Sequence, residues 1–169
     1  AHEFANQHRL PVRADKGVTY YIGGSDKTAI VQTNTDFGSA KFIIDDTAVE
    51  NRKTHIFLVS STLKSYKLEG ITTLKQNQPR IDVSLTHDCL ISVTNSHIKH
   101  FIRYGANQNK GASKTDIFLV DRDGNVDMNV PIIWDFNQIT DISAQPIDKT
   151  PLTISGGHFT TIANKAESK

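Results

Sequence analysis

Cysteine, net charge and long apolar segments are all scarce in this chain of 169 residues. The single cysteine, Cys89, excludes an internal disulfide framework and a zinc site with several thiolates, so we interpret it as a buried, unreactive thiol. The formal net charge of +1 gives no overall field that would concentrate nucleic acid or an anionic membrane. No apolar run approaches the roughly 20 residues of a membrane span. These absences disfavour disulfide scaffolds, nucleic-acid-binding proteins and membrane-spanning proteins.

Familiar catalytic and metal-binding motifs are also missing. The sequence has no Gly-x-Ser-x-Gly nucleophile elbow, and the side chains of the contiguous His87, Asp88 and Cys89 would diverge on a strand. His97 and His100 are three residues apart, a spacing that unites two ligands on a helix but separates them on a strand. Neither nucleophilic hydrolase chemistry nor a zinc site is therefore supported.

Short β-branched and aromatic runs separated by Gly, Asn, Asp and Pro dominate the chain, which is typical of many short strands. The length and a hydrophobic content of 37% favour a single all-β domain over residues 1–169. Irregular strand spacing favours a β-helix with insertions over a sandwich, although no strict repeat is present. The predicted strands are 19–22, 29–32, 40–44, 55–59, 66–68, 89–94, 98–104, 117–120, 132–134, 152–154 and 159–162.

The first residues lie within a helical pattern, with Phe4 and Ala5 on one side and polar side chains around the other. The last predicted strand is followed by a few polar residues without a closing element. No basic-then-apolar leader precedes the domain. We therefore expect the chain to be a piece of a longer parent protein.

Five segments carry a family resemblance: residues 1–6, 10–14, 19–22 (TYYI), 32–38 and 40–46, which include FIIDD. Together they resemble the opening of the pectate-lyase-like β-helix proteins. The resemblance implies a right-handed parallel β-helix in which residues 1–46 form a capping helix and the first coils, and residues 47–169 add further strands with insertions. It also implies an extracellular or cell-surface location and a polysaccharide or glycan partner. Because the family includes lyases, hydrolases, epimerases and phage tailspikes, it implies no mechanism.

An amphipathic helix at this position has a physical purpose. The end of a β-helix exposes unpaired backbone groups and an apolar interior that would recruit other chains. We expect Phe4, Ala5 and Leu10 to close that interior. Val18, Tyr20 and Ile22, or the positions that alternate with them, should begin the apolar stack.

Two carboxylates, Asp45 and Asp46, directly follow the apolar run 42–44. Such a pair can ligate a cation or perform acid/base chemistry. The alternative is that it ends the strand and caps the following turn.

The segment 117–126 predicts a β-hairpin, because Asp123-Gly124 favours a tight turn between apolar runs. Asp121, Asp123 and Asp127 resemble the start of a calcium loop, but Val126 and Ile132 stand where an EF-hand requires Gly and Glu. The alternatives that remain are a looser calcium site and a solvated turn.

Charge is unevenly distributed near the centre of the chain. Four cations and no acid lie between residues 97 and 114, whereas residues 116–148 contain seven Asp and one Arg. Alternation along a strand separates two faces, one with His97, Lys99, Phe101 and Arg103 and the other with Ile98, His100, Ile102 and Tyr104. We expect the face that bears the two isoleucines to point inward. An outward cationic row suits the β-elimination of a polyuronate, which needs carboxylate neutralisation and a base. The alternative is that these side chains keep an exposed strand soluble.

Aromatic side chains supply the candidates for sugar contact. Trp134, next to Asp135, can stack on a sugar ring, or it can be a half-buried core residue. Tyr104 and His97 complete the candidate substrate-binding set.

Two classes of function follow. The first is a polysaccharide lyase or glycoside hydrolase of the β-helix group, with Lys99, Arg103, Asp45, Asp46 and Asp135 as its candidate catalytic residues. The second is a non-catalytic capping or adhesin module of a larger surface or phage-tailspike-like protein. Facing carboxylates, or a cation and a base in one groove, would favour the enzyme, whereas acids spread over separate turns would favour the module.

Overall fold

The computed structural model describes residues 1–23, 27–49, 51, 53–105 and 108–163. The chain divides into two compact units, unit 1 (Ala1–Thr62 and Thr150–Lys169) and unit 2 (Leu63–Lys149). Within the described ranges the structure is mainly β, with one short helix, α1 (His2–His8). None of the described helical residues belongs to a helix long and apolar enough to cross a membrane.

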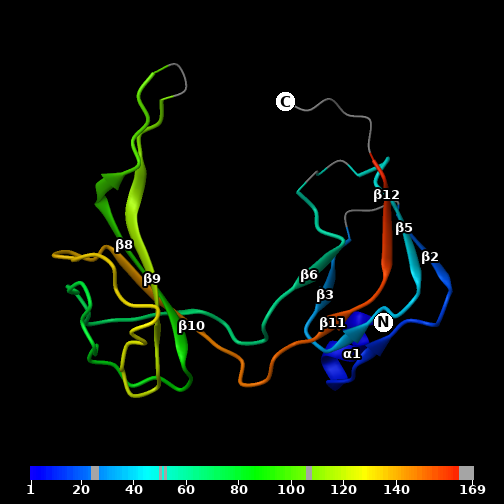
Figure 1. Ribbon diagram of the computed structural model, residues 1–169, viewed down its shortest axis with the longest axis horizontal. Coiled ribbons are helices and arrows are strands. Elements are labelled where there is room, and N and C mark those ends of the chain that lie inside the picture. The colour runs from blue at the N-terminus through cyan, green and yellow to red at the C-terminus, as the bar shows by residue number, and fades with distance from the viewer. Residues whose placement is uncertain (24–26, 50, 52, 106–107, 164–169) are drawn as a thin grey trace. The chain divides into compact units, whose positions relative to one another are not determined.

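Unit 1 consists of β-helix coils, as the sequence predicts (Figure 1). Corresponding strands of successive coils pair in parallel and form the sheets β1–β4–β11, β2–β5–β12 and β3–β6. The strands are β1 (Val12–Arg13), β2 (Thr19–Gly23), β3 (Ala29–Val31), β4 (Thr35–Asp36), β5 (Lys41–Asp45), β6 (Phe57–Val59), β11 (Ile154–Ser155) and β12 (His158–Ile162).

The register of these strands shows where unit 2 enters the chain. We number the coils in chain order: β1–β3 belong to coil 1, β4–β6 to coil 2, and β11 and β12 to coil 3. Thr19 of coil 1 lies opposite Lys41 of coil 2, which lies opposite His158 of coil 3. Residues 19 and 41 are one ordinary coil apart, whereas residues 41 and 158 are separated by all of Leu63–Lys149. Unit 2 is therefore an insertion between β6 and β11, and the β-helix register resumes after it.

An aromatic ladder runs through the interior of unit 1. Tyr20, Phe42 and Phe159 occupy directly opposite positions on β2, β5 and β12. Their rings stack with centroid separations of 5.2 and 4.9 Å and interplanar angles of 15° and 13°. Phe37 packs edge-on against Phe42 at 5.0 Å and against Phe159 at 5.4 Å. Since strands in parallel register place like positions above one another, the coil repeat itself produces this stack.

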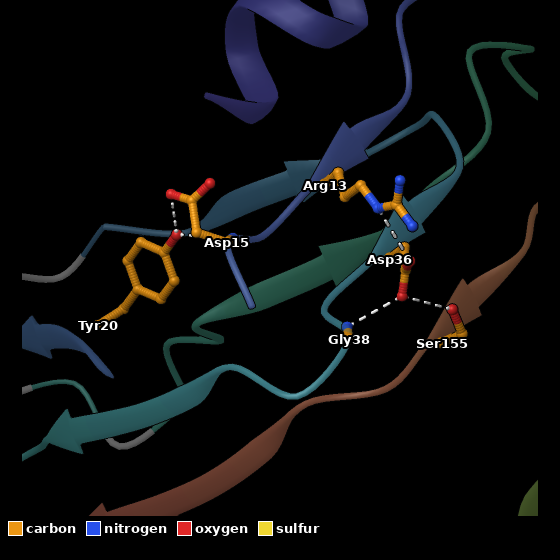
Figure 2. A network of polar contacts seen from close by, with 6 residues as sticks. All are labelled: Arg13, Asp15, Tyr20, Asp36, Gly38 and Ser155. Carbon is orange, nitrogen blue, oxygen red and sulfur yellow. Dashed lines mark hydrogen bonds and ion pairs between the residues drawn. The ribbon is translucent and has the colours of Figure 1, made fainter. Parts of the chain in front are cut away.

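A polar ladder links the same three coils along the β1–β4–β11 sheet (Figure 2). Arg13 forms an ion pair with Asp36 at 3.5 Å, and the Ser155 hydroxyl donates to the other carboxylate oxygen of Asp36 at 3.2 Å. That oxygen also accepts the Gly38 backbone N–H at 2.9 Å, so Asp36 holds both its neighbouring coils and the next corner of its own coil.

Helix α1 covers the free edge of β3, but through residues other than those expected. The Asn6 side chain donates to the Ile30 carbonyl at 2.7 Å and accepts the Gln32 N–H at 3.1 Å, which are the bonds a further strand would make. The buried Ala5 lies on the same side of the helix, as does His2, whose ring packs edge-on against aromatic side chains of coil 2.

The expectation that Phe4 and Leu10 close the interior is wrong, because both side chains are exposed. Docking through Asn6 turns the face formed by residues 2, 5 and 6 inward, which leaves Phe4 outside. Ala5 is the part of the prediction that the structure confirms.

Unit 2 is an antiparallel sheet in the order β7–β10–β8–β9, from β7 (Tyr66–Lys67), β10 (Asp141–Pro146), β8 (Cys89–His100) and β9 (Ala112–Val120) (Figure 1). It has its own buried core, which includes Cys89 as expected. The largest core side chains are Leu74, Ile81, Ile91, Phe118, Ile132 and Phe136.

The strand predicted over residues 98–104 differs from the structure. The pairing of β8 with β9 shifts register between Asn95 and Lys99, and β8 ends at His100. A bulge interrupts the strict alternation of faces, so Ile98 and Ile102 are exposed rather than inward.

We expect Asn6→Ala to lower the free energy of unfolding by about 1–3 kcal/mol, because two backbone groups at the β3 edge lose their partner. Chemical denaturation of the variant and of Gln7→Ala, an exposed position on the same helix, measures the difference. Equal stability of the two variants would contradict the edge-capping role of Asn6.

The burial of His2 predicts that the stability of unit 1 depends on pH. Its Nδ1 atom is buried without a hydrogen-bond partner among the described residues, and burial lowers the pKa of the ring below 6.5. The unfolded chain therefore takes up a proton more readily, so stability is complete above about pH 6.5 and declines below it. Denaturation at pH 7.5 and 5.5 should show a smaller decline for His2→Phe than for the exposed control His55→Gln.

Candidate functional site

The irregular segment 131–136 brings Trp134 to the surface of unit 2. Residues 132–134 do not form the predicted strand. Instead, the buried Asp116 on β9 accepts the Ile133 N–H at 2.7 Å, and Phe136 exchanges two backbone hydrogen bonds with Leu74, at 2.8 and 2.9 Å. Trp134 is thus held between two fixed points of the backbone.

Four residues surround this tryptophan or adjoin it, and we call them, with Trp134, the Trp134 platform: His100, Lys114, Asp135 and Phe136. Trp134 keeps 39% of its surface exposed. Its ring meets that of His100 edge-on at 5.3 Å, and the Lys114 ammonium group lies 5.9 Å from its centroid and 5.1 Å from that of Phe136. Lys114 also donates to the Asp135 carbonyl, which fixes the cation beside both rings.

Asp135 itself holds the backbone of the neighbouring loop. One carboxylate oxygen accepts the Gln76 N–H at 2.8 Å. Trp134 and Asp135, which the sequence singled out, therefore do lie in one exposed cluster, but one oxygen of this carboxylate is engaged by the loop.

The remaining candidates on the hairpin are spread along it. The Lys99 ammonium group donates to the Ser113 hydroxyl across the hairpin at 2.8 Å, and the His97 N–H donates to the Asn95 side chain at the bulge. Arg103 and Tyr104 lie beyond the end of β8 and are exposed. His97, Lys99 and Arg103 therefore do not form the single row that strict alternation predicted.

Asp45 and Asp46 belong to unit 1, at the end of β5. Asp45 accepts the Thr47 hydroxyl at 2.6 Å and the Thr47 N–H at 3.0 Å, and these bonds hold the pKa of its carboxyl below the ordinary value. The backbone N–H of Asp46 donates to Ile162 of coil 3. This geometry matches the turn-capping alternative.

The acids proposed for calcium are also engaged within turns. Asp121 accepts the Asp123 and Asn125 N–H groups, both at 2.9 Å, and the Asn125 side chain, which lowers the pKa of its carboxyl. Asp127 accepts the N–H and the side chain of Asn129. Within the described ranges, no group of three or more His, Cys, Asp or Glu residues is placed to hold a metal ion.

The predicted turn at Asp123-Gly124 is present. Gly124 has φ of 88°, and an added Cβ would lie 2.3 Å from the Ile81 carbonyl oxygen, so glycine is required there. Val120 and Val126 then meet in an antiparallel bridge rather than a second full strand.

His100, Lys114 and Phe136 are the members of the platform that sequence reasoning did not assign to it. The signal for His100 and Lys114 was the cationic stretch 97–114, but the sequence does not show which residues of that stretch face Trp134. That choice depends on the register in which Asn95 opposes Lys114.

Comparison with protein-family models gives no match, and no curated protein matches the chain in sequence.

We expect Lys114→Met to destabilise unit 2 by about 1 kcal/mol, because the cation–π contacts and the bond to Asp135 are lost. The emission of Trp134, the only tryptophan, should also shift. Denaturation followed by fluorescence tests both effects, with Lys110→Met as the exposed control. If the two variants behave alike, Lys114 does not support the platform.

Proposed function

We propose that this chain is a glycan-binding, non-catalytic end module of a larger extracellular or cell-surface β-helix protein related to the pectate-lyase-like group. Unit 1 supplies the capped end of the β-helix, and unit 2 presents the Trp134 platform to a polysaccharide. The observation that carries the proposal is the partly exposed Trp134 ring, which contacts the His100 ring and the Lys114 ammonium group.

The platform has the composition that sugar recognition requires. A tryptophan face provides a flat apolar surface for the C–H groups of a sugar ring. Hydroxyl groups around that ring need polar partners, and the His100 ring and the Lys114 ammonium group lie 5.3 and 5.9 Å from the centre of the indole. Because Asp116 and Phe136 fix the backbone on both sides, little conformational entropy is lost on binding.

The distribution of acids favours a binding module over an enzyme. Glycoside hydrolysis needs two facing carboxylates, and β-elimination needs a cation and a base in one cleft. Asp45 and Asp121 instead cap turns on different units, and Lys99 is bonded to Ser113.

The resemblance of residues 1–46 to the opening of pectate-lyase-like proteins supports the wider context. The end of the stack opposite α1 also supports this context. There β12 pairs with β5 on one side, and every β12 residue is exposed. Phe159, the last ring of the aromatic ladder, is 47% exposed. A further coil of a parent β-helix would cover both the strand edge and this ring.

Binding of the purified chain to immobilised plant, algal and host polysaccharides tests the proposal. At least one polysaccharide should bind, and Trp134→Ala should weaken binding about tenfold or more, since a large aromatic contact is removed. The matched control is Tyr21→Ala, an exposed aromatic residue on β2.

Three results would contradict the proposal. The first is the absence of binding to any polysaccharide. The second is an equal effect of the two variants on binding. The third is the release of unsaturated products or new reducing ends from a bound polysaccharide, which would make the chain an enzyme.

A further inference from the structure

The far end of the β8–β9 hairpin carries one sign of charge. Three cations, Lys99, Arg103 and Lys110, lie there, and the sequence has no Asp or Glu between residues 97 and 114. In Figure 1 this end extends beyond the rest of the unit 2 sheet. We call the described residues 98–105 and 108–111 the hairpin tip. Although the whole chain is nearly neutral, the hairpin tip is locally basic.

Large apolar side chains project from the same hairpin tip. Phe101 is 80% exposed and Tyr104 is 88% exposed. Ile98 and Ile102 also leave more than two fifths of their surfaces accessible. Four such side chains within seven residues form a local apolar surface rather than an isolated exposed residue.

Local backbone structure holds these side chains outward. Phe101 adopts φ of 55°, a conformation that bulky residues rarely occupy unless the surrounding structure imposes it. The Asn109 side chain accepts the Arg103 N–H at 3.2 Å and the Gly111 N–H at 2.9 Å, which ties the two arms together. An added Cβ at Gly111 would lie 2.7 Å from the Ile102 side chain and 3.0 Å from the His100 carbonyl, so the arms pack closely.

We propose that the hairpin tip is a peripheral membrane anchor that inserts into the surface of an anionic lipid bilayer. Phe101, Ile102 and Tyr104 enter the boundary between headgroups and acyl chains, where aromatic side chains are favoured. Arg103 and Lys110 remain at the level of the lipid phosphates and bind them.

An anionic lipid bilayer fits this surface better than an anionic polymer does. The aliphatic Ile98 and Ile102 gain free energy in hydrocarbon, whereas neither offers the flat face on which sugars or bases stack. The hairpin tip is also the end of a projecting hairpin, which suits insertion into a soft, flat surface. The hairpin tip shares His100 with the Trp134 platform, but none of the side chains assigned to insertion belongs to that platform, which lies where the paired strands meet segment 131–136.

Cosedimentation of the full chain with vesicles tests the anchor. We expect binding to phosphatidylcholine vesicles that contain phosphatidylglycerol, and little binding to phosphatidylcholine alone. The double variant Phe101→Ser/Tyr104→Ser should bind these vesicles at least about tenfold more weakly than the wild-type chain. Arg103→Gln/Lys110→Gln should lose about fivefold per cation, with a weaker salt dependence. Because these side chains are exposed, the variants should fold.

Matched substitutions elsewhere provide the control. Tyr21→Ser combined with Lys16→Gln and Lys64→Gln removes exposed residues of the same kinds and should leave vesicle binding unchanged. As a direct measure of depth, the added tryptophan of Phe101→Trp should be quenched by lipids brominated on their acyl chains, while wild-type emission from Trp134 is not.

Three results would overturn the proposal. One is the absence of binding to anionic vesicles. Another is binding that depends on the cations but not on Phe101 and Tyr104, because it would be electrostatic adsorption without insertion. The third is loss of polyuronate or DNA binding in the same variants without any vesicle binding, which would assign the hairpin tip to a soluble polymer.

Discussion

A strand at the end of a parallel sheet leaves its outward N–H and C=O groups without a strand partner, and unit 1 has such an end in each of its sheets. At β3 the Asn6 side chain supplies both missing bonds, and helix α1 is oriented by that contact. Between the coils, parallel register satisfies the backbone and at the same time stacks Tyr20 on Phe42 and Phe42 on Phe159. Edge pairing therefore determines the helix position, the interior and the site at which a further coil would add.

The insertion of unit 2 is compatible with this constraint because it enters where the chain passes from one coil to the next. The entropic cost of closing a loop grows slowly with its length, and unit 2 offsets that cost with a core of its own. The same core fixes the platform, because Asp116 on β9 is buried and its bond to Ile133 places Trp134 at the surface. The position of Trp134 is therefore determined by contacts within unit 2.

Sequence patterns were sufficient to predict the strands that have a continuous apolar or β-branched run, which are β2, β3, β5, β6 and β12. Helix α1 was predicted from the placement of Phe4 and Ala5 on one side of a helical pattern. The two-residue strands β1 and β4 have no such run, and β10 ends in Pro146, which argues against a strand in sequence terms. The segments 98–104 and 132–134 were assigned to strands on apolar content alone. A bulge and a buried carboxylate decide their actual conformations.

The candidate site, like the fold, could be predicted from the sequence only in part. The adjacent Trp134 and Asp135 are visible in the sequence, which leaves the exposure of the indole ring open, and so are the turn-capping alternatives for Asp45 and Asp121. The partners of Trp134 are not visible, because His100 and Lys114 reach it only through the antiparallel register of β8 and β9.

The parallel stacking of coils 2 and 3 across the insertion is the central claim, and disulfide formation tests it most directly. In parallel register Lys41 faces His158, so the pair Lys41→Cys/His158→Cys should form a disulfide upon mild oxidation. Lys41→Cys/Ile162→Cys should not, because four residues of offset place the two Cα atoms about 13 Å apart, beyond the reach of a disulfide. The buried Cys89 does not compete. The opposite result, in which only the second pair crosslinks, would show that β5 and β12 are antiparallel and would contradict the β-helix.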